Sequence, residues 1–250
     1  MSVKAALLCG GTGSRLRPLT YYFQKTMLPI GTSQKPILEF IIYYLKSNQI
    51  KEITMLVGYK AEQIVNYFRD GSNFGIKVDY SYDNEELKGN GGALINAYRA
   101  GKFDGYEDVL IYYSDILTEM NLAELLKFHR DKKFSATIAV SDHYKLPVGV
   151  SEIKGEKVVS FKEKPSININ PTIGVLVMKT EAIKKFSNYK GEVDIMGDMV
   201  SSLVKDQSVG GYITNSYWID VGTTETYEKL DHEMLEKLSL IHISEPTRPY

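Results

Sequence analysis

The alternation of two hydrophobic periods along the chain constrains its fold most. The apolar runs with the length of buried strands are 5–9, 53–57, 109–113 and 136–140. Between them, apolar residues recur three and four positions apart, as at 38–45 and 61–68, which is the spacing of one helix face. Strands that alternate with helices need crossover connections, so we expect an α/β fold. The predicted architecture is a Rossmann-like, mostly parallel mixed sheet flanked by helices.

The second half of the chain is less regular. Residues 148–152 and 157–161 predict a hairpin, and the other predicted elements are strands at 173–178 and 217–219 and helices at 196–203 and 227–238. No linker or repeat interrupts the chain, and at roughly 150 residues per domain this length allows one large domain. We therefore predict a single domain over residues 1–238 with inserted β-structure. The tail 239–250 follows a completed amphipathic helix and carries two prolines, so we expect it to be non-native or disordered.

Composition excludes several classes of function. With 30 Lys and Arg against 31 Asp and Glu, the net charge of −1 removes the main argument for nucleic-acid binding. The single cysteine, Cys9, excludes an internal disulfide framework and a cysteine-rich zinc site. No apolar run of about 18 residues exists and no signal peptide is visible, so we expect no membrane partner and a cytoplasmic location. Apolar helix faces serve both cores and subunit interfaces, so a homo-oligomer stays open beside a monomer.

A glycine-rich turn follows the first predicted strand. Gly10, Gly11 and Gly13 let the backbone approach a ligand, and their N–H groups can face an anion. In open α/β sheets, ligands bind beyond the carboxyl ends of the strands, where this turn lies. The cations that follow the turn are Arg15, Arg17 and Lys25, a set that suits a triphosphate. The segment is neither a P-loop nor a good dinucleotide fingerprint, and a simple tight turn is the alternative.

Two distant aspartates end predicted strands. Asp115 follows the run 109–113, and Asp220 follows 217–219. Carboxylates at strand ends face the cleft, and Mg²⁺ is typically held by one or two carboxylates together with substrate phosphates. We therefore expect Asp115 and Asp220 to share one Mg²⁺. The alternative for each is a helix N-cap.

Two shorter segments are less specific on their own. Phe161–Pro165 reads FKEKP, which is also typical of a solvated charged turn after a strand. Gly89–Ala93 reads GNGGA and precedes a predicted helix, so its glycines allow flat contact with a base or sugar. The alternative there is a loop and a helix start.

Taken in order, these segments resemble the sugar-1-phosphate nucleotidyltransferases, also called nucleotide-sugar pyrophosphorylases. The matching segments are GGTGSRLRPLT at 10–20 with Lys25 downstream, GNGGAL at 89–94, YSDIL at 113–117, FKEKP at 161–165 and WIDVGT at 218–223. The resemblance spans residues 3 to about 235 and is to the short form of the family, because no β-helix repeat follows. It implies a Rossmann-like sheet with the inserted β-structure over the sugar site.

The resemblance also implies a reaction. A nucleoside triphosphate (NTP) and a sugar 1-phosphate give a nucleotide-sugar and pyrophosphate, with Mg²⁺ as cofactor and in-line attack on the α-phosphorus. The expected sugar is a hexose or heptose 1-phosphate, and the expected nucleotide is dTTP, UTP or GTP. The attacking phosphate is already an anion, so positioning and charge neutralisation are the main catalytic tasks.

The resemblance implies a role for each matching residue. Arg15 holds the NTP phosphates and the departing pyrophosphate, Lys25 neutralises charge at the α-phosphate, and Lys164 clamps the sugar phosphate. Asp115 and Asp220 hold the metal. The residues expected to contact the nucleotide are Gly10, Gly11, Gly13, Asn84 and Gly91. Those expected to contact the sugar phosphate, besides Lys164, are Gly149, Glu163, Thr172 and Asp194.

Two departures from the family pattern fall beside these residues. Gln24 stands where the family usually has proline before the lysine, so we expect a looser turn there. Ser114 replaces the glycine before the first aspartate, and we expect its side chain to crowd the metal or the substrate.

Two other functions remain as alternatives. The first is a catalytically silent relative that binds nucleotide-sugars as a sensor or a subunit. The second is a dinucleotide-dependent oxidoreductase, which predicts an acidic residue after the second strand. Residues 57–60 supply none.

Overall fold

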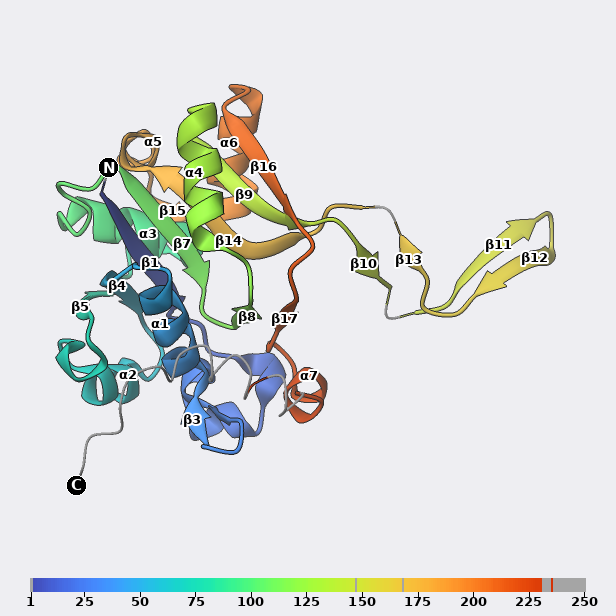
Figure 1. Ribbon diagram of the computed structural model, residues 1–250, viewed down its shortest axis with the longest axis horizontal. Helices are drawn as coiled ribbons and strands as arrows, with labels where there is room; N and C mark the ends of the chain where they lie inside the picture. Colours follow the sequence, from blue (N-terminus) through green and yellow to red (C-terminus); the bar gives the residue numbers. More distant parts are fainter. Residues whose placement is uncertain (1, 147, 168, 231–234, 236–250) are drawn as a thin grey trace.

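A seven-stranded mixed sheet forms the centre of the molecule (Figure 1). The computed structural model describes residues 2–146, 148–167, 169–230 and 235. In spatial order the strands are β16 (Val209–Thr214), β9 (Ala136–Ser141), β14 (Thr172–Lys179), β7 (Asp108–Tyr113), β1 (Val3–Cys9), β4 (Glu52–Val57) and β5 (Lys77–Tyr82). All run parallel except β14, which is antiparallel to both of its neighbours. The predicted mostly parallel α/β sheet is therefore confirmed.

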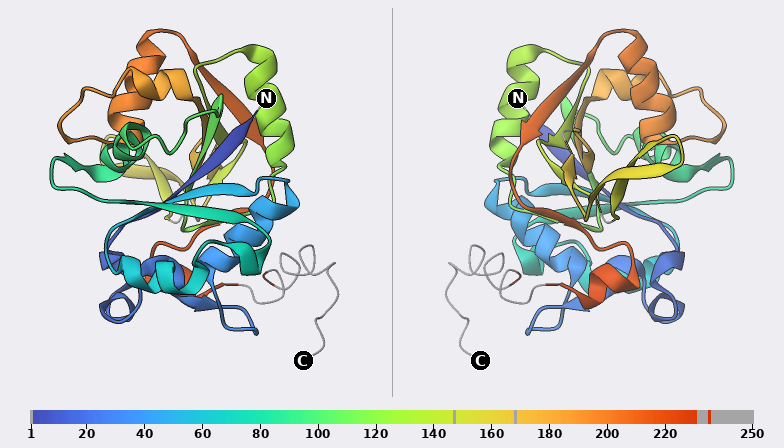
Figure 2. Two further views of the ribbon diagram at one scale, coloured as in Figure 1. Left: turned by 90° about the vertical axis from the view of Figure 1, so that its left-hand side faces the viewer. Right: turned by 90° about the vertical axis from the view of Figure 1, so that its right-hand side faces the viewer.

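Helices cover both faces of this sheet (Figure 2). Those packed in the core on one face are α1 (Ile37–Ser47), α2 (Ala61–Phe68) and α4 (Leu122–Lys132). Those on the other face are α3 (Gly89–Arg99), α5 (Thr180–Lys184), the π-helical turn η5 (Ile195–Val200) and α6 (Ser201–Lys205). Strand β1 shows why both faces are covered, since Ala5 and Leu7 enter one core and Ala6 enters the other. Such continuous apolar strands are typical of parallel sheets.

The helix expected at 196–203 is present, but its first part has π-helical geometry. The last helix expected at 227–238 lies largely outside the described residues. Its neighbourhood contains α7 (Thr224–Glu228) and the buried Leu235. The expected tail 239–250 lies wholly outside the described residues.

Short elements line the carboxyl edge of the sheet. The 3₁₀ turns at this edge are η1 (Ser14–Leu16), η2 (Leu19–Tyr21) and η3 (Lys25–Met27), whereas η4 (Ser72–Phe74) precedes β5 at the opposite edge. The two-stranded ladders pair β2 (Pro29–Ile30) with β3 (Lys35–Pro36), β6 (Leu87–Lys88) with β15 (Gly191–Glu192), and β8 (Ile116–Thr118) with β17 (Trp218–Asp220). In the last ladder Asp220 lies opposite Ile116, directly beside Asp115. The ladder thus joins segments that lie about a hundred residues apart in the sequence.

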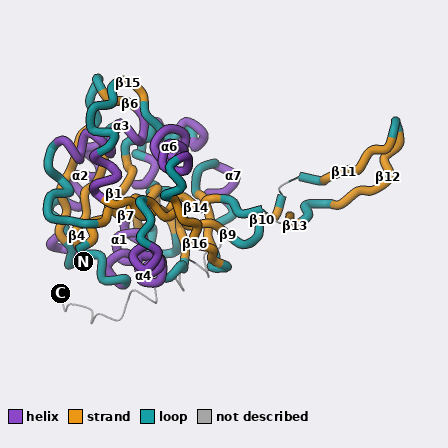
Figure 3. The backbone as a smooth tube through the Cα atoms, turned by 90° about the horizontal axis from the view of Figure 1, so that it is seen from above, coloured by secondary structure: helices purple, strands orange, loops and turns teal. Residues whose placement is uncertain are grey.

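An arm leaves the body beyond β9 and β14 (Figures 1 and 3). It consists of a stem, β10 (Tyr144–Lys145) with β13 (Ser166–Ile167), and a hairpin, β11 (Val150–Lys154) with β12 (Lys157–Lys162). The predicted hairpin is therefore confirmed. Both views show the hairpin pointing away from the body. Every residue of β11 is exposed, so the body does not hold the hairpin down.

Candidate active site

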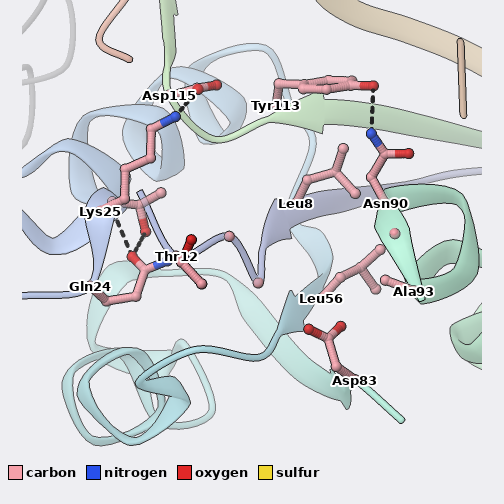
Figure 4. A pocket seen from close by; sticks show the side chains of 14 residues that line it. Leu8, Thr12, Gln24, Lys25, Leu56, Asp83, Asn90, Ala93, Tyr113 and Asp115 are labelled. Carbon is pink, nitrogen blue, oxygen red and sulfur yellow. Dashed lines mark hydrogen bonds and ion pairs between the residues drawn. The ribbon is translucent and has the colours of Figure 1, made fainter. Parts of the chain in front are cut away.

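A pocket of about 380 Å³ opens at the carboxyl ends of β1, β4 and β7 (Figure 4). Its lining residues are Leu8, Gly10, Gly11, Thr12, Gln24, Lys25, Thr26, Leu56, Asp83, Gly89, Asn90, Ala93, Tyr113 and Asp115. Figure 4 shows that the charged pair Lys25 and Asp115 lies at one end, and that Leu56, Ala93 and Asp83 lie at the other. The pocket therefore has one end suited to anions and one with apolar walls.

Lys25 and Asp115 form an ion pair at the charged end. Their side chains are only 15% and 17% exposed, so water screens the pair weakly. Lys25 begins η3, and Asp115 lies two residues after the last residue of β7. Two rigid elements thus fix an ammonium group and a carboxylate at the mouth of the pocket.

Gln24 braces the turn that carries Lys25, contrary to the expected loose turn. Its side chain is buried, and its Nε2 donates a hydrogen bond of 2.6 Å to the Cys9 carbonyl at the end of β1. Its Oε1 accepts from both the backbone N and the Oγ1 of Thr26, each at 2.6 Å. Its backbone N donates to Gln63 Oε1 on α2. The amide provides donors and acceptors that a proline lacks, so it ties the strand end to the first turn of η3.

Asp220 and Arg15 lie next to this pair. The Val221 N donates to the Asp115 carbonyl at 2.8 Å, which holds the two aspartates side by side. A Cβ added to Gly222 would lie 2.6 Å from Asp220 Oδ1 and 3.0 Å from Arg15 Nη2, so carboxylate and guanidinium flank the same glycine. Neither aspartate caps a helix, since β8 follows Asp115 and Thr223 caps α7.

The charged neighbours of Asp220 shift the pKa of its carboxyl group. Burial and the charge of Asp115 raise the pKa of the Asp220 carboxyl above its usual value, against the opposing charges of Lys25 and Arg15. Asp220 Oδ1 is buried and has no hydrogen-bond partner within the described part of the chain. A buried carboxylate oxygen without a partner is unfavourable unless a cation or a donor binds it.

The donor set fits a hard divalent cation completed by substrate. Among the described residues, no group of three or more His, Cys, Asp or Glu could hold a metal ion. Two adjacent carboxylates, one with an unpaired oxygen, remain at Asp115 and Asp220. Mg²⁺ commonly uses one or two carboxylates, with phosphate oxygens and water in its other positions.

Ser114 does not crowd this site as expected. Its side chain is buried, and its Oγ lies 3.2 Å from the Cys9 Sγ. Burial raises the pKa of the Cys9 thiol to about 12, so the thiol is a packing group and not a nucleophile.

The residues expected to contact the nucleotide divide into two sets. Gly10 and Gly11 line the pocket, whereas Gly13, Asn84 and Gly91 do not. Gly13 has φ +62°, and a Cβ there would lie 3.0 Å from the Lys25 Cβ, so it lets the loop pack on the Lys25 segment. The Asn84 Oδ1 accepts from two backbone N–H groups of its own turn. Gly91 is buried against Val193.

Asp194 lies behind the pocket wall and holds Asn90. Its Oδ2 accepts from Asn90 Nδ2 at 2.9 Å, and its Oδ1 accepts from Gly197 N as the cap of η5. Asn90 Nδ2 also donates to the Tyr113 hydroxyl at 3.2 Å. Asn90 and Tyr113 therefore form a fixed polar edge of the pocket.

The other residues expected to bind the sugar phosphate lie outside the pocket lining. Gly149, Glu163 and Lys164 are on the arm, and Thr172 is exposed at the start of β14. A Cβ on Gly149 would lie 3.0 Å from Glu163 Oε2, so these two residues meet at the base of the hairpin.

Lys164, at this base, lies near α7. The pKa of Glu225 on α7 is lowered, first by Lys229 and to a smaller extent by the Lys164 ammonium. The neighbouring Thr224 Oγ1 donates to the Arg15 carbonyl at 3.3 Å. The arm base therefore lies within electrostatic reach of α7, which contacts the Arg15 turn.

Asp83 and Gln24 are further pocket residues that sequence reasoning did not assign. Asp83 follows the last residue of β5 directly, and Asp115 follows the last residue of β7 after one intervening residue. A polar residue at the end of a strand in the same sheet is a signal that could have found Asp83, had β5 been predicted. The role of Gln24 needed coordinates, because its partners lie on three different elements.

Comparison with known proteins relates this site to one family. The sequence profile described as nucleotidyl transferase matches residues 4–237. The chain is 30% identical over 246 residues to a UTP–glucose-1-phosphate uridylyltransferase of Synechocystis sp., with 90% of this chain covered. It spans only 61% of the length of that relative. It is 32% identical to a D-glycero-α-D-manno-heptose 1-phosphate guanylyltransferase of Campylobacter jejuni, covering 90% of this chain and 97% of the relative.

Solved structures share the fold. A structure described as a putative glucose-1-phosphate thymidylyltransferase from Bacillus anthracis, in complex with a sucrose, superposes with a TM-score of 0.73. The alignment covers 99% of this chain and 98% of the other at 20% identity. None of the helices in the described ranges is both long and apolar enough to cross a membrane.

Proposed function

This chain belongs to the nucleotidyl transferase family, and we propose that it joins an NTP to a sugar 1-phosphate, releasing a nucleotide-sugar and pyrophosphate. The observation that carries this proposal is the charged end of the pocket. There Lys25 and Asp115 line the pocket beside a glycine turn at the ends of parallel strands, and Asp220 and Arg15 lie next to them outside the lining. Cations and paired carboxylates at such an edge suit two phosphorylated reactants that repel each other.

The proposed reaction is a single displacement at phosphorus. An oxygen of the sugar phosphate forms a bond to the α-phosphorus, and the bond from that phosphorus to the oxygen bridging to the β-phosphorus breaks. Pyrophosphate takes the electron pair of the broken bond. The nucleophile is already ionised, so no residue has to remove a proton.

Each side chain then has an electrostatic task. The Lys25 ammonium leaves Asp115 for the α-phosphate, whose charge grows during the displacement. Arg15 offers a planar guanidinium to the outer phosphates and to the departing pyrophosphate. Gly10 and Gly11 expose backbone N–H groups to the nucleotide without side chains that would block it.

Asp115 and Asp220 would hold a divalent ion of the Mg²⁺ type. Bound there with substrate phosphates, the ion would neutralise their charge. The unpaired buried oxygen of Asp220 supports this assignment.

Residues at the base of the arm would bind the sugar 1-phosphate. Lys164 lies near α7, whose Thr224 contacts the Arg15 turn, and this supports a role of its ammonium in meeting a second phosphorylated reactant. Glu163 and Gly149 adjoin each other there and would contact sugar hydroxyls. The contacts of Asp194 instead support a role in holding Asn90.

A substrate panel tests the proposal. Five NTPs would be mixed with glucose, mannose and heptose 1-phosphates in the presence of Mg²⁺, and pyrophosphate release would be measured. We expect release that requires both reactants and stops on chelation. No release with any pair, despite nucleotide binding, would overturn the proposal and favour a silent sensor of the same fold.

A further inference from the structure

Asp83 is a pocket carboxylate that the proposed reaction does not use. Its backbone N donates to the Val57 carbonyl at 2.9 Å, which fixes it across the end of β4. A Cβ on Gly58 would lie 1.9 Å from Asp83 Oδ2, and one on Gly10 would lie 2.8 Å from the same oxygen. The carboxylate therefore occupies a space that exists because positions 10 and 58 have no side chains.

Among the described residues, no hydrogen bond or charged neighbour contributes to the electrostatics of the Asp83 carboxylate. Burial alone raises its pKa, and no neighbouring cation or hydrogen bond opposes that shift. The Asp83 side chain is exposed at the pocket, so its oxygens are open to a ligand that enters there. An ionised carboxylate has two acceptor oxygens, so Asp83 can accept two hydrogen bonds from a bound ligand.

The surroundings of Asp83 suit a flat ring. Leu8, Leu56 and Ala93 line the same region of the pocket, and Lys25 and Asp115 lie across from it (Figure 4). If the proposed function holds and the NTP phosphates meet Lys25, the nucleobase extends toward Asp83. The pocket then offers the base apolar walls and one charged acceptor.

The chemistry of a carboxylate discriminates among bases. Guanine presents two adjacent donors, N1–H and N2–H₂, which match the two oxygens of one carboxylate. Uracil and thymine present a single N3–H between two carbonyl oxygens, which a carboxylate repels. Adenine and cytosine present one amino group beside an unprotonated ring nitrogen. Only guanine makes a bidentate, charge-assisted pair with an ionised Asp83.

We propose that Asp83 reads the Watson–Crick edge of guanine and makes GTP the preferred nucleotide of this chain. This inference rests on the proposed function for the orientation of the nucleotide. It assigns Asp83 to specificity and not to the chemical step.

Equilibrium binding tests the inference independently of turnover. Titration calorimetry would measure GTP, ITP, dGTP, UTP, dTTP and ATP on the full chain and on Asp83→Asn. ITP is guanosine triphosphate without the 2-amino group, so the GTP-to-ITP ratio isolates the second hydrogen bond. Asp104→Asn, an exposed aspartate outside the pocket, is the matched control.

We expect the wild-type chain to bind GTP at least tenfold more tightly than ITP, UTP, dTTP or ATP. Asp83→Asn should bring the GTP-to-ITP ratio near one, whereas Asp104→Asn should leave it unchanged. Tighter binding of UTP, dTTP or ATP, or an unchanged ratio in Asp83→Asn, would overturn the inference. A change in the GTP-to-dGTP ratio instead would assign Asp83 to the ribose and overturn it as well. Guanine-selective binding without pyrophosphate release would refute the proposed function alone.

Discussion

At the scale of single residues, the two aspartates are the sharpest test of the site. Asp220→Asn removes the charge beside Asp115 and keeps nearly the same shape. We expect turnover to fall roughly 100-fold or more, because the proposed metal site loses one of its two carboxylates, while the melting temperature stays near wild type. Pyrophosphate release at several Mg²⁺ concentrations and thermal unfolding would measure both effects. Asp131→Asn, on the exposed face of α4, is the control. A near-wild-type rate for Asp220→Asn would remove Asp220 from the metal site.

Gln24 gives a second prediction at this scale. Gln24→Ala removes the bonds that hold Lys25 in place, so we expect kcat to fall about 10- to 100-fold with a smaller change in the KM for NTP. Steady-state kinetics would separate the two parameters. The control is Gln63→Ala, which loses a bond to the backbone of Gln24 but leaves the bonds to Cys9 and Thr26 intact. Equal losses in both variants would mean that Gln24 stabilises the fold without positioning Lys25.

At the scale of elements, Asp108 connects β7 to α4. It is the first residue of β7, so it lies at the edge of the sheet opposite the pocket. Arg130 Nε donates to Asp108 Oδ2 at 2.9 Å, and His129 Nε2 lies 3.5 Å from Oδ1. Burial by itself raises the pKa of Asp108, but the neighbouring His129 and Arg130 outweigh it and lower the pKa below its usual value of 3.8. The stability that this carboxylate contributes is therefore present above its unfolded pKa. It is lost as pH falls through the lower, folded pKa.

Asp108→Asn should show this linkage. At pH 7 we expect the variant to be less stable by about 1–3 kcal/mol, and we expect the two curves to approach each other as the pH falls below 3.8 through the folded pKa. Urea unfolding monitored by circular dichroism across this range measures the difference. A constant difference at every pH would mean that Asp108 acts through shape and not through its charge.

At the scale of the whole molecule, the arm is separable from the body. The exposed apolar residues of its hairpin are Val150, Ile153, Val158, Val159 and Phe161. An isolated two-stranded hairpin is marginally stable at best, and this one shares no ladder with the central sheet. Its removal should therefore leave the cores of the body unchanged.

Replacing Val150–Lys162 by a two-glycine turn should shift the melting temperature by no more than about 2 °C, since surface segments contribute little to stability. We expect nucleotide affinity to stay within twofold. We expect the KM for sugar 1-phosphate to rise at least tenfold, because the hairpin strands no longer hold Glu163 and Lys164 in position. Calorimetry and pyrophosphate release would measure the two affinities. A large loss of nucleotide binding would show that the hairpin belongs to the nucleotide site.

Local pattern determined the fold class, because the period of apolar residues reports which side chains each strand or helix buries. The local sequence pattern also determined which strand ends carry charged residues. A glycine turn or an apolar run precedes each of the four charged residues, which are Arg15, Lys25, Asp115 and Asp220. Only the tertiary structure decided which of these groups face one another. The β8–β17 ladder sets Asp220 beside Asp115, and the Gln24 amide joins β1 to η3. Such pairings join segments far apart along the chain, so no local period records them. The direction of the arm was likewise open, because a hairpin's own sequence sets its register but not the surface it packs on.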